Sequence, residues 1–244
     1  MQSSITGFAY LATLFSMGFL TYRFFQYWQK EKTVVSKCFL FYMAVLGIFF
    51  LVSAIPALFF ANNVAALKFV VISTAFLEGL ASAFLGYLIV HLIIPKVSPW
   101  LGFLVPFILG VIATVLSITT PFLPFLEQDK SINWGYQPTA YIFRNLVHIT
   151  TILPMSIILF KLYRRAEGPR DKARSLGLGM VLVFGIIIAI FDYGIEKSLN
   201  LRAVSSDIVQ IVLSIFLFIF LLVTQKRPRE RDENLPPGYF KTIH

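Results

Sequence analysis

The sequence predicts an all-α, polytopic membrane protein, a seven-transmembrane helix bundle with its N-terminus outside and its C-terminus in the cytoplasm. Composition is the first observation: the chain is 57% apolar and only 14% charged, whereas a soluble domain is about half apolar and about a quarter charged. The second is that the charges crowd into short segments between long, almost uncharged stretches. The third is an unequal distribution of lysine and arginine between the two sides of the membrane.

Seven apolar stretches are each near the roughly 20 residues that a helix needs to cross about 30 Å of hydrocarbon. Because lipid offers the backbone no hydrogen bonds, each stretch is expected to be a helix. The first stretch has no positively charged leader and no small-residue cleavage site, so we expect a retained span and not a signal peptide. The spans are about 5–25, 38–60, 65–94, 100–120, 138–162, 174–195 and 204–224.

Two domains follow from these spans. Residues 1–225 form the transmembrane domain, and 226–244 form a short, basic cytoplasmic tail that is too short to be a catalytic domain. The side of the bundle richer in basic residues is expected to face the cytoplasm. That side holds most lysines and arginines, at 23–37, 96, 161–174 and 226–241; the few on the other side are Lys68, Lys130, Lys197 and Arg202.

Several kinds of chemistry are not predicted. The net charge of +9 is explained by the basic loops, so no nucleic-acid partner is expected, and the single cysteine, Cys38, allows neither an intramolecular disulfide nor a CxxC pair. The last span has no lysine for retinal, and His91 and His148 lie at different depths, which is unfavourable for haem. Because protease and nucleotide-binding motifs are also missing, we predict no catalytic residue, no metal and no cofactor.

Polar residues inside the predicted spans are few, and they define the candidate site. An ionisable group at mid-membrane costs about 2.5–3.5 kcal/mol on insertion scales, so such groups should face the bundle interior and find partners. Arg144 and His148 are four residues apart and therefore share a helix face. The candidate ligand-binding residues are Arg144, Asn145, His148, Glu78, Asp192, Asp207 and Gln210, the last two continued by Ser214 at helical spacing.

Depth estimates at about 1.5 Å per residue divide these residues into two levels. Arg144, Asp192 and Asp207 are expected near the outer surface, while His148 and Glu78 lie deeper. Together they would line a crevice open to the outside. The alternative is purely structural: Arg144 pairs with Asp192 or Asp207 to join three spans, and Glu78 is protonated and hydrogen-bonded to a neighbour.

Two further patterns bear on the architecture. Ala75, Gly79 and Ala83, with Gly86 beyond, place small residues on one face of the third span, which lets two helix backbones approach closely. The longest outer connection, 121–137, contains prolines, a glycine and aromatic residues. It is either a structured lid or a plain surface loop.

The layout resembles the seven-transmembrane N-terminal sensor region of bacterial histidine kinases, over about residues 1–225. The carriers are a basic first inner loop, an outer turn, a basic loop leading straight into span six, and a turn before the last span. In sequence these are YRFFQYWQKEKTVVSK, ALFFANN, KLYRRAEGPRDKARSLGLGM and DYGIEKSLNLRAVSSD. The resemblance implies a multi-pass protein of a bacterial inner membrane, although no kinase follows the last span in this sequence.

The polar cluster and this resemblance predict a receptor or sensor. An unknown small ligand would bind in the outward-facing crevice, and loops or a cytoplasmic signalling partner would carry the response. Two other functions stay open: a small transporter or channel with Glu78 and His148 as a relay, and a structural subunit whose basic face binds anionic lipid. The predicted partners are thus the lipid bilayer, the ligand and the signalling partner, and a homo-oligomer stays open.

Overall fold

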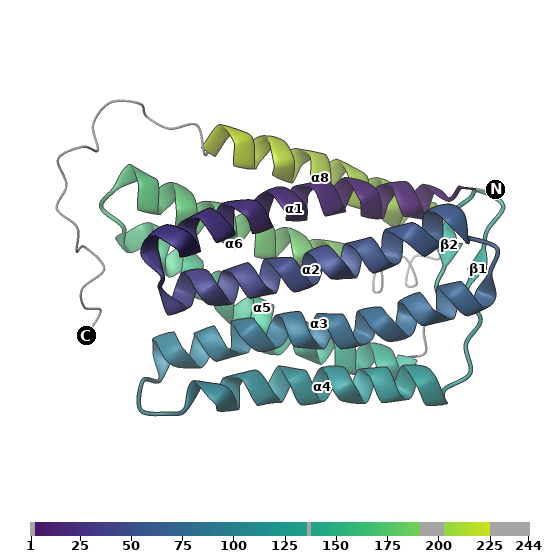
Figure 1. Cartoon of the computed structure of the whole chain (residues 1–244), viewed down its shortest axis with the longest axis horizontal. Helices are drawn as coiled ribbons and strands as arrows, with labels where there is room; N and C mark the ends of the chain where they lie inside the picture. The colour runs from purple at the N-terminus through teal and green to yellow at the C-terminus, as the bar shows by residue number, and fades with distance from the viewer. Residues whose placement is uncertain (1–2, 136–137, 191–202, 225–244) are drawn as a thin grey trace.

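The computed structural model describes residues 3–135, 138–190 and 203–224 and shows a bundle of long helices running side by side (Figure 1). Six helices of the described chain are long and apolar enough to cross a membrane. This confirms the prediction of an all-α, multi-pass membrane protein. The long helices are α1 (Ile5–Glu31), α2 (Val34–Phe59), α3 (Val64–Ile93), α4 (Pro99–Thr119), α5 (Pro138–Arg165), α6 (Pro169–Ile190) and α8 (Ala203–Thr224).

Each predicted span overlaps one of these helices, and α1, α2 and α5 are longer than the apolar runs predicted for them. Helix α1 continues to Glu31, where Lys32 takes a left-handed conformation (φ 48°) and ends it. Side chains fix several starts: the Asn63 carboxamide accepts the backbone N–H groups of Ala65 and Ala66 and so caps α3. The sixth span, predicted over 174–195, is described as α6 as far as Ile190.

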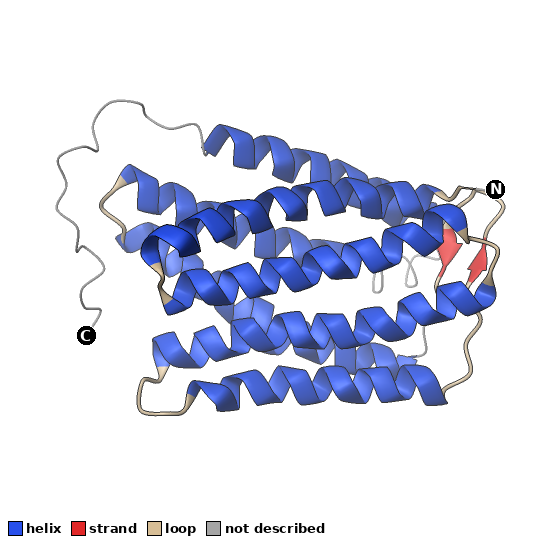
Figure 2. Cartoon of the chain, viewed as in Figure 1, coloured by secondary structure: helices blue, strands red, loops and turns tan. Residues whose placement is uncertain are grey.

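Neighbouring helices are mostly consecutive in sequence. Helix α1 packs on α2 and α8, α2 on α3, and α3 on both α4 and α5. Helix α5 also packs on α4 and α6, and α6 packs on α8. The last described helix therefore returns to the first, and α3 and α5 meet across the bundle (Figure 2).

Glycines bring α3 and α4 into backbone contact. A Cβ atom added to Gly79 would lie 2.5 Å from the Cα atom of Gly110, and one added to Gly86 would collide with the carbonyl of Gly102. No side chain larger than hydrogen fits at either crossing. The small-residue face of α3 is therefore a close helix contact, as predicted, and α4 is its partner.

The connection between α4 and α5, which the sequence predicts to be on the outer side, is structured over its described residues 121–135. Strands β1 (Phe125–Leu126) and β2 (Ile132–Asn133) form a short antiparallel hairpin at the end of the bundle where α1 begins. Ile132 and Trp134 are 2% and 6% exposed and pack with residues from the end of α2 and the start of α3. The hairpin is thus a lid on the bundle and not a plain surface loop.

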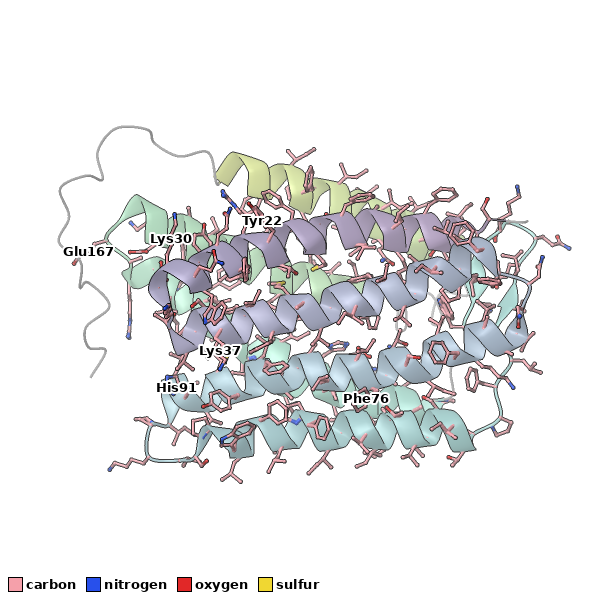
Figure 3. All side chains as sticks on the ribbon, in the orientation of Figure 1. Tyr22, Lys30, Lys37, Phe76, His91 and Glu167 are labelled. Atoms are coloured by element: carbon pink, nitrogen blue, oxygen red, sulfur yellow. The ribbon has the colours of Figure 1, made fainter. Side chains whose placement is uncertain are left out.

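Many of the basic residues lie at one end of the bundle. Lys30, Lys37, His91 and Glu167 all lie at the end opposite the lid (Figure 3). The helix connections around residues 32, 96 and 166 also lie at this end. The predicted grouping of basic residues on one side is therefore present among the described residues.

Candidate functional site

Glu78 is the centre of the candidate site. It lies midway along α3, one residue before the glycine that contacts α4, and is 8% exposed. Gly79 lies on the face of α3 that contacts α4, and the preceding residue, Glu78, faces α5. A carboxyl group at such a position requires hydrogen-bond donors from neighbouring helices, because lipid supplies none.

Helix α5 supplies these donors from two successive turns. Arg144 Nε donates to Glu78 Oε2 at 2.5 Å, and His148 Nε2 contacts Glu78 Oε1. Each carboxylate oxygen thus has its own partner. The side chains of Arg144 and Glu78 are 6% and 10% exposed, whereas that of His148 is 20% exposed. An ionised carboxylate accepts hydrogen bonds, and here two N–H groups converge on it. Charge-assisted hydrogen bonds of this kind are about twice as strong as neutral ones.

The bond to Glu78 requires a hydrogen on Nε2 of the His148 imidazole. His148 must carry hydrogen on Nε2 in order to donate, so in a neutral ring Nδ1 is an acceptor. Nδ1 is buried and has no hydrogen-bond partner among the described residues. Glu78 and Arg144 balance each other in charge, so a neutral His148 leaves these three groups neutral overall, and a proton on Nδ1 would leave one positive charge.

The surroundings are apolar and strengthen these interactions. Residues of α1, α2, α3, α5, α6 and α8 form the large hydrophobic core, including Met43, Leu85 and Met155. Tyr42 of α2 is buried and lies within electrostatic reach of Glu78. Coulomb interactions in such a setting are several times stronger than in water. The cluster therefore links α3 to α5 with groups that are costly to separate.

The remaining predicted residues lie in different places. Asp207 and Gln210 are buried on α8 and face α1: Asp207 Oδ2 accepts from the Thr6 hydroxyl at 2.6 Å, and Gln210 Nε2 donates to Thr13 Oγ1 at 3.0 Å. Asn145 is half-buried on α5 beside Arg144. Asp192 lies outside the described residues. These hydrogen bonds and ion pairs thus form two groups, one between α3 and α5 and one between α1 and α8.

The structure gives Arg144 a partner that the depth estimate did not name. The estimate put Arg144 at the level of Asp192 and Asp207, and the structure pairs it with the deeper Glu78. A pairing with Asp192 stays a prediction, because that residue lies outside the described residues. The estimate used backbone positions, whereas an arginine side chain is long enough to reach a partner at another level. The expected pairing of His148 with Glu78 is present.

Sequence reasoning missed the hydroxyl groups of α1. Thr6 and Thr13 are 1% and 3% exposed and provide the partners of Asp207 and Gln210. Threonine is common in membrane helices because it can bond to its own backbone, so neither residue is conspicuous alone. Their seven-residue spacing, repeated by Asp207 and Ser214, is the pattern that would have identified them.

A surface pocket of about 620 Å³ lies elsewhere, at the turn between α2 and α3. Residues 59–65 line it. None of the charged groups of the cluster borders this pocket. It therefore does not serve as the crevice that the sequence predicted.

Comparison with known proteins adds no relative to these observations. No family model matches the chain, and no curated protein or solved structure is significantly similar to it. Function must therefore be inferred from the geometry of the chain.

Proposed function

We propose that this protein is a receptor-like or sensor-like membrane protein with seven spans, an outer N-terminus and a cytoplasmic C-terminus. Six described helices are long and apolar enough to cross the membrane, and α6, predicted as a span to residue 195, would be the seventh. The basic end of the bundle would face the cytoplasm, in accordance with the positive-inside rule. A bacterial inner membrane is the location that the resemblance to histidine-kinase sensor regions favours.

The single observation that carries this proposal is the buried cluster of Glu78, Arg144 and His148, in which Nδ1 of the imidazole has no hydrogen-bond partner among the described residues. Ionisable groups inside a membrane are costly and mark functional sites more often than not. Nδ1 of His148 offers a ligand one hydrogen-bond position beside an ion pair. A small polar ligand that enters from the lid end would find donors and acceptors there.

Binding would change the relation of α3 to α5, because the cluster joins these two helices. A ligand that prefers one arrangement of the bundle shifts the population toward it, and shifts of about 1–2 Å at helix interfaces are typical. Helix α5 ends in Lys161, Arg164 and Arg165, directly before the short turn into α6. A cytoplasmic partner bound to these basic residues would detect the movement of α5.

A ligand screen with matched variants tests the proposal. Purified wild type and His148→Gln, which keeps a donor group near Glu78, are heated with a panel of polar metabolites. We expect at least one compound to raise the melting temperature of the wild type and not of the variant, while the His91→Gln control responds like the wild type, because His91 is exposed at the far end. Equal stabilisation of wild type and His148→Gln would contradict the assignment.

A second candidate function is a proton or ion relay, and the same histidine favours it. A buried carboxylate in contact with an imidazole whose other nitrogen is unpartnered among the described residues is a pair through which a proton can pass. Flux into proteoliposomes distinguishes the two candidates. Proton-coupled uptake that Glu78→Gln abolishes would support the relay, whereas ligand binding without flux supports the receptor.

Orientation has its own test. The only cysteine, Cys38, is buried, so Cys38→Ser provides a background for single new cysteines. We expect an impermeant thiol reagent added to intact cells to label a cysteine at Asn62 and not one at Glu167. The reverse labelling would overturn the proposed orientation.

A further inference from the structure

The lid and the last described helix share one chain of hydrogen bonds, and the hydroxyl of Thr6 is its central link. This hydroxyl accepts the backbone N–H of Ile132 in β2 at 2.8 Å and donates to Asp207 Oδ2 of α8 at 2.6 Å. An N–H group can only donate and a carboxylate can only accept. The direction of the chain is therefore fixed, from the lid through α1 to α8.

The lid is tied to the start of α1 as well. The backbone N–H of Ile5 donates to the carbonyl of Lys130 at 2.8 Å. The Ser4 hydroxyl donates to the carbonyl of Ala57 and so ties the start of α1 to α2, on which the lid also packs. Tyr10 of α1 contacts Trp134 of the lid, with ring centroids 6.0 Å apart. The first turns of α1 thus hold the lid through backbone, hydroxyl and aromatic contacts.

Farther along the two helices the bonding continues. The α1–α8 seam is defined here as Thr6, Thr13 and Ser16 of α1 with Asp207, Gln210 and Ser214 of α8. Thr13 Oγ1 accepts from Gln210 Nε2 and lies 2.8 Å from Ser214 Oγ, and the Ser16 hydroxyl donates to the backbone carbonyl of Ser214 at 3.3 Å. Polar positions seven residues apart on both helices keep the seam on one face of each.

Directional bonds make this seam behave differently from an apolar contact. Apolar side chains can slide past one another at little cost, whereas each hydroxyl or amide that leaves its partner inside a membrane has no water to replace it. A lid that moves away from Thr6 would leave the Ile132 N–H without its acceptor, and the Thr6 hydroxyl would keep only its bond to Asp207. Movement of the lid together with α1 and α8 keeps these bonds.

We propose that the outer lid, the first turns of α1 and helix α8 form one mechanical unit, so that an event at the outer surface is transmitted along α8 to the opposite end of the bundle. The unit is separate from the Glu78 cluster and does not require that cluster to bind a ligand. It provides a route from the outside to the far end that passes along the α1–α8 face of the bundle. The coupling is reciprocal, so loosening the seam must also loosen the lid.

Hydrogen exchange of the protein in nanodiscs tests this reciprocity. Thr13→Val removes a seam hydroxyl seven residues beyond Thr6 on α1, and the readout is exchange at the Ile132 amide. An interhelical hydrogen bond in a membrane is worth about 0.6 kcal/mol on average, which corresponds to roughly threefold faster exchange at a coupled site. We expect that increase in Thr13→Val and a near wild-type rate in Thr13→Ser, which restores the hydroxyl.

The matched control is Thr21→Val on the same helix. The Thr21 hydroxyl donates to the carbonyl of Met17 within α1, so its loss leaves the seam intact. If Thr13→Val does not fold, Ser214→Ala removes a seam hydroxyl from the α8 side with a smaller change. Ile132 exchange that stays at the wild-type rate in the seam variants, or that rises equally in Thr21→Val, overturns the proposal.

Discussion

Separating the buried ion pair of Glu78 and Arg144 is the most direct test of the candidate site. The perturbation is Glu78→Gln, which preserves the shape of the side chain but removes the negative charge that faces both Arg144 and His148. Removing one partner of a buried ion pair costs about 3–5 kcal/mol, because the other charge stays buried without compensation. For a chain of this size each kcal/mol lowers the melting temperature by about 2–4 °C, so we expect a decrease of about 6–20 °C.

A double-mutant cycle separates the pair from the individual residues. Glu78→Gln, Arg144→Gln and the double variant are unfolded in mixed micelles, and the free energies of unfolding are compared. Two neutral amides replace two charges in the double variant, so it should lose less than the sum of the single variants, by about 2 kcal/mol. Glu167→Gln is the control, since Glu167 is exposed at the end of the bundle. A coupling energy below about 0.5 kcal/mol would refute the reasoning that this pair joins α3 to α5.

Two further predictions concern packing. Gly79→Ala should destabilise the bundle by about 1–3 kcal/mol in thermal unfolding, because the new Cβ atom would lie 2.5 Å from the Cα atom of Gly110. The control Gly47→Ala should be nearly neutral, because a Cβ atom at Gly47 meets open space. Similar losses of stability in both variants would contradict the close contact between α3 and α4. Trp134→Ala should loosen the lid and accelerate proteolysis within 121–135, because it leaves a cavity at a buried site. The same change at the exposed Trp100 should have little effect. A lid that stays resistant to proteolysis in Trp134→Ala would contradict the account of a packed lid.

The sequence predicted the helices well because a membrane span is determined by a continuous apolar run. It predicted their ends less well, as α1 shows: the apolar run ends near residue 25, but the backbone hydrogen bonds continue to the left-handed Lys32. Hydropathy reports the lipid environment of a segment, whereas the end of a helix depends on capping. The close α3–α4 contact was predictable from glycine spacing, although the partner helix was not.

The sequence identified the residues of the candidate site better than it identified their hydrogen-bond partners. Glu78 and His148 were expected at similar depth, and they are in contact. The pairing of Arg144 with Glu78 was not predicted, because the reach of a long side chain is not encoded in helix depth. Asp207 and Gln210 were expected in the same crevice, and the structure shows them hydrogen-bonded to Thr6 and Thr13 of α1. A pairing between the first and last helices depends on tertiary packing that no local pattern specifies.

The ion pair between α3 and α5 has a consequence for biosynthesis. Glu78 precedes its partner Arg144 by 66 residues, so α3 leaves the ribosome well before the arginine exists. At about 5–20 residues per second, that interval is roughly 3–13 s. During it an acidic side chain must remain at the insertion machinery or in a water-accessible position, and α4 can already be docked through the glycine contacts. We expect α5 to be the element whose arrival releases the half-built bundle into lipid.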